Sequence, residues 1–141
     1  MYSCTMSAEI RVICLFVAML SVIHAYTASA AIPPEELGNC RGRRYTLPEL
    51  EYYDENELIA TYCRCRFSAR NASELVSVQE QIVEATSAAF GRNSSSAIDA
   101  VNDLKSARFE AEVSSANRAS VLRILKRNFQ SGSDPACPDS H

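Results

Sequence analysis

The chain has 141 residues, of which 14 are basic and 17 acidic, giving a formal net charge of −3 at pH 7. A net negative charge argues against nucleic-acid binding, and this length provides one domain with a modest core. Four glycines leave no room for a phosphate-binding glycine loop.

Residues 1–30 have the pattern of a secretory signal peptide. An uncharged run at 12–23 is too short to span a bilayer comfortably, and small residues at 28–30 suit a signal peptidase. We therefore expect cleavage between Ala30 and Ala31. The alternative is a signal anchor that stays in the membrane. No second hydrophobic span follows, so we expect a secreted, extracellular protein without stable membrane insertion.

The part that survives cleavage, residues 31–141, is expected to form a single disulfide-stapled domain. It contains four cysteines, and an even number in an oxidising compartment predicts two disulfides. One cysteine lies near each end and two are central, so we expect each central cysteine to bond to one terminal partner. The sequence does not choose between the two pairings. The cysteines are Cys40, Cys63, Cys65 and Cys137.

A metal site is a weaker interpretation of the same cysteines. Zinc binding needs reduced thiolates and normally a different paired spacing. We therefore expect neither a metal nor a cofactor.

Two segments alternate with period two and are predicted to be strands. In 58–67 this places Cys63, Cys65 and Phe67 on one face, where the two cysteines are badly placed to bond to each other. The second segment is 108–114, for which the alternative is one long helix, because Glu and Ala are good helix formers.

Helices are expected at 71–90, 96–106 and 117–130. Asn71 is predicted to cap the first, and Gly91 to end it as a left-handed cap. Gly132 is expected to end the last helix, and a shorter helix is expected to start at Thr46 and Pro48. The apolar stripe predicted to pack into the core comprises Leu75, Val78, Ile82, Ala85 and Ala89, with Val76, Val83 and Phe90 alongside.

The predicted fold class is therefore α+β. We expect a small, mainly helical domain in which 58–67 and 108–114 form a short antiparallel sheet, with helices 71–90 and 117–130 packed on one face. The alternative is an all-α disulfide-stapled bundle.

Two sequons, at Asn71 and Asn93, predict N-glycosylation in a secreted chain. A glycan on Asn71 competes with the helix-capping role expected for that residue.

No catalytic residues are predicted, and the chain is not expected to be an enzyme. After signal cleavage the only histidine is His141, the terminal residue, so the ordered part offers no Ser-His or Cys-His pair.

The stretch 41–57 concentrates charge and aromatic residues without apolar periodicity, which is typical of a recognition loop. We expect an unknown extracellular protein or a sulfated polysaccharide to contact Arg43, Arg44, Tyr52 and Tyr53. The tyrosines lie among acidic residues, which suits sulfation. The alternative is that they pack a short helix against the core.

These features together favour a secreted, non-enzymatic binding protein that acts by protein–protein contact as an effector, a toxin-like ligand or a carrier. One alternative is a structural protein of the extracellular matrix. Another is a prohormone cleaved at the dibasic pair Arg43-Arg44.

Overall fold

The computed structural model describes residues 31–130 and 132–138. The predicted signal segment, its cleavage boundary at Ala30 and the terminal His141 lie outside these described residues. Contacts divide the chain into two units, Met1–Ala30 and Ala31–His141, and the described residues belong to the second.

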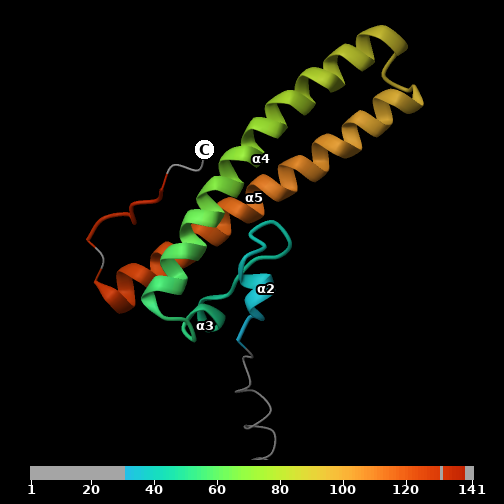
Figure 1. The fold of residues 1–141 in the computed structure, drawn as a ribbon. Helices are drawn as coiled ribbons and strands as arrows, with labels where there is room; N and C mark the ends of the chain where they lie inside the picture. The colour runs from blue at the N-terminus through green and yellow to red at the C-terminus, as the bar shows by residue number, and fades with distance from the viewer. Residues whose placement is uncertain (1–30, 131, 139–141) are drawn as a thin grey trace, which may run out of the picture. The chain divides into compact units, whose positions relative to one another are not determined.

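The described part of the chain is helical and contains no strand. It comprises α2 (Pro34–Leu37), α3 (Leu47–Leu50), α4 (Glu55–Phe90) and α5 (Ser95–Phe129). Helices α4 and α5 run antiparallel as a long hairpin, and the N-terminal segment with α2 and α3 packs beside the end of the hairpin away from its turn (Figure 1). The predicted α+β class is therefore wrong, and the structure is all-α.

The predicted strand at 58–67 lies within α4. Its alternation is accidental, because the side chains that are buried along this stretch follow helical spacing and Phe67 is 48% exposed. A period of 3.6 brings residues three or four apart onto one face, and this face packs against the core. The buried positions of α4 are Leu58, Thr61, Tyr62, Cys65, Ala69 and Ala72.

The predicted strand at 108–114 is also helical and forms the middle of α5. Ala107, Val113 and Ser114 are buried, whereas Phe109, on the expected inner face of the strand, is 56% exposed. The separate helices expected at 96–106 and 117–130 are parts of this one element.

Helix α4 begins sixteen residues before the predicted start at Asn71. Asp54 is its N-cap: the Asp54 carboxylate accepts from the Glu57 N–H at 2.9 Å, and Glu57 accepts from the Asp54 N–H at 3.1 Å. This capping box satisfies backbone donors that the first turn leaves free. Asn71 therefore lies in mid-helix and has no capping role.

The hairpin turn is short and contains Gly91, as the sequence indicates. Gly91 has φ 84° and ψ 150°, so it ends α4 with a positive φ but outside the left-handed helical region that was expected. Ser94 caps α5, its hydroxyl accepting from the Ala97 N–H at 3.2 Å. At the other end Gln130, with φ 54° and ψ 29°, ends α5 two residues before Gly132.

The hydrophobic core lies at the end of the hairpin away from its turn. There the N-terminal segment covers both long helices, and the buried side chains come from this segment, from the first half of α4 and from the last part of α5. The core comprises Ile32, Leu37, Cys40, Tyr45, Leu50, Leu58, Tyr62, Cys65, Val121, Ile124 and Leu125.

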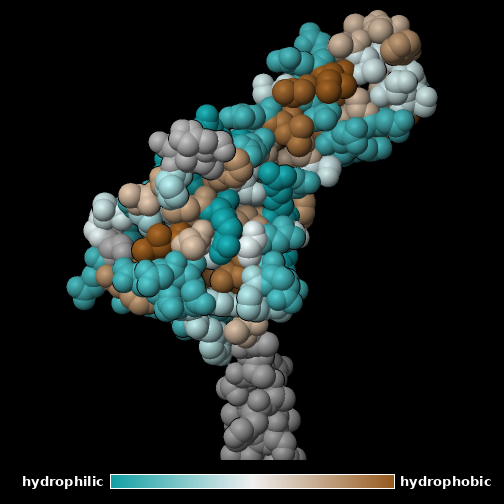
Figure 2. Space-filling model, viewed as in Figure 1, coloured by the Kyte–Doolittle hydropathy of each residue, from teal (hydrophilic) through white to brown (hydrophobic). Residues whose placement is uncertain are grey.

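Beyond this core the two helices have only each other to pack against. Alanines such as Ala72, Ala97 and Ala100 are buried between them. The predicted burial of the α4 stripe is wrong: Leu75 is 40%, Val78 50% and Ile82 42% exposed. Figure 2 shows hydrophobic side chains gathered over the distal part of α4.

Two disulfides tie the unit together. Cys40 bonds to Cys65 and Cys63 bonds to Cys137, across sequence separations of 25 and 74 residues. On a helix, residues two apart project about 200° from each other. Cys65 therefore faces the core and Cys40, while Cys63 faces outward and takes the C-terminal tail. The expectation that these two cysteines have separate partners agrees with the structure, although the strand geometry behind it was wrong.

Candidate functional site

The arginines of the N-terminal segment are held by carboxylates of the same unit. Arg41 pairs with Glu110 at 3.5 Å, and Arg44 pairs with Glu112. Arg43 pairs with two carboxylates, Glu36 at 3.2 Å and Glu49 at 3.0 Å. These ion pairs leave little positive charge on this segment for an external partner.

The pKa values around Arg43 reflect this pairing. Burial of Arg43 disfavours its charged form, but hydrogen bonds to Glu36 and Glu49 outweigh this effect and raise the pKa of Arg43. Burial also disfavours the charged form of Glu49, but hydrogen bonds from the Thr46 hydroxyl and N–H and from Arg43 lower the pKa of Glu49. The Thr46–Glu49 contacts start α3, which confirms the short helix expected there.

The four residues predicted to contact a partner do not form one free surface. Arg43 and Arg44 are engaged as described, and the Tyr53 hydroxyl donates to the carbonyl of Ile32. Burial raises the pKa of Tyr53. Of the two tyrosines, only Tyr52 is well exposed, at 59%. The packing interpretation therefore describes Tyr53, and Tyr52 remains open to a partner or to sulfation.

Asn117 of α5 fixes the path of this segment. Its side chain is fully buried and accepts from the Tyr45 N–H at 2.7 Å, while its amide nitrogen donates to the carbonyls of Cys40 at 3.0 Å and Arg43 at 2.7 Å. A protease needs an extended, accessible backbone on both sides of its cleavage site. The dibasic pair ends at Arg44, directly before Tyr45, so this anchoring disfavours cleavage there.

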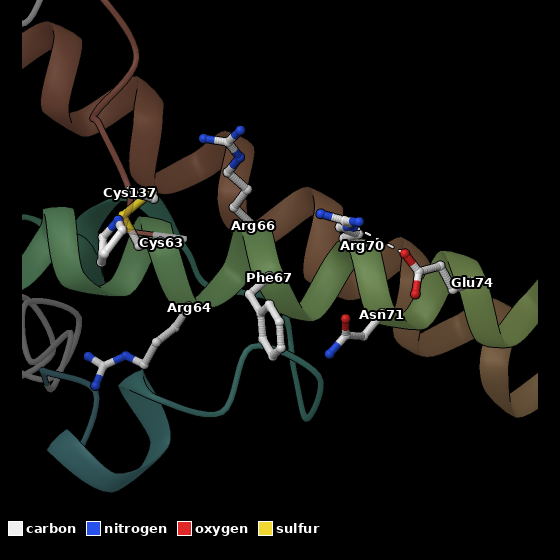
Figure 3. Close-up of a pocket in the computed structure, with 9 residues that line it drawn as sticks. Cys63, Arg64, Arg66, Phe67, Arg70, Asn71, Glu74 and Cys137 are labelled. Carbon is white, nitrogen blue, oxygen red and sulfur yellow. Dashed lines mark hydrogen bonds and ion pairs between the residues drawn. A yellow bond between two sulfur atoms is a disulfide. The ribbon is translucent and has the colours of Figure 1, made fainter. Parts of the chain in front are cut away.

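A groove of about 610 Å³ lies on the outward face of α4. Figure 3 shows Phe67 and Arg64 projecting from one edge of α4 and Arg66 and Arg70 from the other, and all four line the groove. The disulfide between Cys63 and Cys137 closes one end, so the C-terminal tail forms one of its walls. The groove is also lined by Asn71, Glu74 and Pro138.

These arginines are less neutralised than those of the N-terminal segment. Arg70 pairs with Glu74 at 3.1 Å, and both side chains are largely exposed. Arg64 donates to the Thr61 hydroxyl at 3.4 Å. Within residues 31–130 and 132–138, neither Arg64 nor Arg66 has a carboxylate partner. The groove thus combines an exposed aromatic ring with two guanidinium groups that have no carboxylate partner among the described residues.

The tail that forms the wall is held by a second set of contacts. Asp134 accepts from the Tyr62 hydroxyl at 3.1 Å and pairs with Lys126 at 3.2 Å. The hydrogen bonds from Lys126 and then from Tyr62 lower the pKa of Asp134. Burial, followed by the hydrogen bond to Asp134, raises the pKa of Tyr62. The contacts and the disulfide together hold the tail against both long helices.

The two sequons lie in different surroundings. Asn93 is exposed in the hairpin turn, whereas Asn71 is half-buried on the groove wall and is followed by the fully buried Ala72. A glycan at Asn93 would project away from the folded body, and one at Asn71 would occupy the groove.

The groove offers positive charge, hydrogen-bond donors and an apolar ring, which suits binding of an anionic group. In the described part of the chain, no group of His, Cys, Asp and Glu is arranged to hold a metal ion. No helix that the structure describes is both long and apolar enough to cross a membrane.

Sequence reasoning placed the partner contacts at Arg43, Arg44, Tyr52 and Tyr53, none of which lines the groove. It missed Arg70 altogether. The available signal was the spacing of Arg66, Phe67 and Arg70 once 58–90 is taken as one helix, because residues four apart share a face. The sequence carries no comparable signal for the internal partners of the other arginines.

Comparison with known proteins gives no relatives: no protein-family model matches the chain, and no curated protein or solved structure is significantly similar to it.

Proposed function

We propose that this chain is a secreted, non-enzymatic binding protein that contacts an acidic surface of an extracellular protein through the groove on α4. The observation that carries the proposal is the pair Arg64 and Arg66, which line the groove together with the exposed ring of Phe67 and have no carboxylate partner among the described residues. Its two disulfides indicate an oxidising compartment, which supports secretion.

The apolar content of this surface favours a protein partner over a sulfated polysaccharide. Phe67 is 48% exposed in the groove, and the exposed side chains Leu75, Val78 and Ile82 follow it along α4. Buried aromatic and aliphatic side chains supply much of the binding energy in protein interfaces. A sulfated polysaccharide has charge for the arginines but no apolar side chains to cover this surface.

A rigid site lowers the entropy lost on binding. The arginines project from one continuous helix, and the neighbouring tail is fixed by the disulfide at Cys63 and by Asp134. Such a preformed surface suits recognition of a folded partner. The same features support glycosylation at Asn93, which leaves the groove open, over Asn71.

The test uses an immobilised helical peptide of Glu, Leu and Ala as an acidic, apolar probe, with immobilised heparin as the comparison. We expect the parent protein to be retained by the peptide. The double substitution Arg64→Gln/Arg66→Gln should lower the affinity roughly tenfold or more, because it removes two charge-assisted contacts.

The matched control is Arg41→Gln/Arg44→Gln, which changes the net charge equally but removes arginines that already have internal partners. Equal weakening by both double variants would show that only net charge matters and would overturn the proposed site. Retention by heparin but not by the peptide would instead identify a sulfated polysaccharide as the partner class.

A further inference from the structure

The two disulfides differ in how accessible they are. Cys40 and Cys65 lie in the core and are 2% and 0% exposed. Cys63 and Cys137 are half-buried, and both line the groove on α4 (Figure 3). A disulfide is reduced by a thiolate that must reach one of its sulfur atoms. Of the two bonds, the folded protein therefore presents the one between Cys63 and Cys137 to such a reagent.

The C-terminal tail, residues 132–138, has few other polar attachments to the long helices. Among the described residues these attachments are the two made by Asp134, which accepts from the Tyr62 hydroxyl at 3.1 Å and pairs with Lys126 at 3.2 Å. The side chains of Lys126 and Asp134 are 48% and 57% exposed, so water weakens their attraction. The disulfide is therefore the main attachment that keeps the tail in place as a wall of the groove.

We infer that the Cys63–Cys137 bond is a redox switch for the groove. A protein dithiol of the thioredoxin type, acting outside the cell, reduces the bond, the tail leaves α4, and the groove loses one wall. The oxidised protein binds its acidic partner and the reduced protein releases it. This inference rests on the proposed function, since it assigns a regulation to the same groove.

The reaction is a thiol–disulfide exchange in two steps. A thiolate of the dithiol attacks the Cys137 sulfur and forms a mixed disulfide with it, while the Cys63–Cys137 bond breaks and its electron pair leaves on Cys63, which takes a proton from water. The second thiol of the reductant then attacks its own sulfur in the mixed disulfide and expels Cys137, which is protonated in turn. The dithiol has lost two electrons and become a disulfide, and Cys63 and Cys137 are both thiols.

The surroundings of Cys63 favour this direction of attack. Arg64 and Arg66 line the same groove, and neither has a carboxylate partner among the described residues. Positive charge stabilises a thiolate, and a better-stabilised thiolate leaves faster in the exchange. An acidic partner bound in the groove neutralises these arginines and covers the bond, so binding opposes reduction. The converse follows from linkage: a reduction that weakens binding must itself be disfavoured by binding.

Reduction of this bond leaves the folded body intact. The Cys40–Cys65 bond remains in the core and still joins the N-terminal segment to α4. Arg64, Arg66 and Phe67 keep their places on the helix, but without the tail they lie on a convex surface that contacts a ligand from one side only. The change is therefore confined to the groove and affects affinity rather than folding.

Stepwise reduction tests the inference. The oxidised protein is treated with increasing dithiothreitol, a small dithiol, and its free thiols are alkylated and located by peptide mass. We expect Cys63 and Cys137 to be alkylated first, while Cys40 and Cys65 stay bonded and the circular dichroism stays helical. At that stage the affinity for the immobilised peptide of Glu, Leu and Ala should be roughly tenfold lower, because the wall is no longer fixed. Reoxidation should restore it.

Two variants separate the disulfide from the polar contacts of the tail. Cys63→Ser/Cys137→Ser should bind as weakly as the reduced protein, and dithiothreitol should not weaken it further at concentrations that leave Cys40–Cys65 bonded. Asp134→Asn, which keeps the disulfide and loses the ion pair, should bind within about twofold of the parent. A saturating concentration of the soluble peptide should slow reduction of the parent.

The inference is overturned if both disulfides open at the same dithiothreitol concentration, or if the partly reduced protein binds as tightly as the oxidised one. Failure of the proposed function looks different, because the oxidised parent would then not be retained by the peptide at all. Release of the tail can be measured without any ligand. An endoprotease that cleaves before aspartate should cut at Asp134 faster in Cys63→Ser/Cys137→Ser than in the parent, and equal rates would also overturn the inference.

Discussion

Two buried polar residues of α5 provide a direct test of what holds the N-terminal segment in place. Asn117 and Ser114 lie three residues apart, and both side chains are fully buried. Asn117 makes three hydrogen bonds to the backbone of the segment, whereas the Ser114 hydroxyl has no partner among the described residues. Replacing each with alanine should therefore have opposite effects on stability.

The expected magnitudes follow from these contacts. Asn117→Ala removes three hydrogen bonds, each contributing about 1 kcal/mol, and leaves the Tyr45 N–H and two carbonyls buried without partners. Alanine has a better helix propensity than asparagine, which offsets roughly 0.5 kcal/mol of this loss. The free energy of unfolding should therefore fall by about 3 kcal/mol. Ser114→Ala removes no bond and should leave stability unchanged or raise it by up to about 1 kcal/mol.

Urea unfolding with the disulfides intact measures both effects. Amide hydrogen exchange at Tyr45 adds a local measurement, because its N–H should lose protection in Asn117→Ala and keep it in Ser114→Ala. A loss below about 1 kcal/mol for Asn117→Ala, with Tyr45 still protected, would refute the assigned role of this side chain. An equal loss for Ser114→Ala would show that burial alone, rather than hydrogen bonding, matters at both positions.

Three further outcomes are expected. By the loop-entropy model, Cys63→Ser/Cys137→Ser should lower the free energy of unfolding by up to about 4 kcal/mol. The far-ultraviolet circular dichroism should stay helical, and loss of the helices would contradict the peripheral position of this bond. Burial raises the pKa of Tyr45 to about 12 in the folded protein, from about 10 in the unfolded chain. Burial of the neutral tyrosine therefore contributes fully to the free energy of unfolding below pH about 10, and this contribution is lost as the pH rises towards 12. Tyr45→Phe should therefore make urea unfolding less dependent on pH across that range, and an unchanged dependence would exclude Tyr45 as its source. A dibasic-specific protease should cleave after Arg44 slowly in the parent and faster in Asn117→Ala, and rapid cleavage of the folded parent would restore the prohormone alternative.

The sequence by itself was sufficient where a local signal is unambiguous. Thr46 and Pro48 mark the start of α3, and Gly91 marks the turn between the long helices, because each constrains its own backbone. Cys63 and Cys65 were also recognised as needing separate partners. That conclusion holds on a strand or on a helix, since residues two apart are badly placed to bond to each other in either.

The pairing itself could not be read from the sequence. Exchanging the partners of Cys63 and Cys65 changes each loop by only two residues, and loop entropy varies with the logarithm of length, so the two pairings are nearly equal in the unfolded chain. The structure decides between them because the turn of α4 directs Cys65 to the core beside Cys40 and directs Cys63 outward to the tail.

The fold class and the site were decided by tertiary structure for a related reason. The run at 58–67 satisfies both period two and period 3.6, and short apolar runs do not distinguish them. Packing against Val121, Ile124 and Leu125 of α5 favours the helix. Likewise, whether an arginine is free depends on carboxylates far along the chain: Glu110 and Glu112 neutralise the N-terminal segment, whereas Arg66 has no such neighbour among the described residues and remains available in the groove.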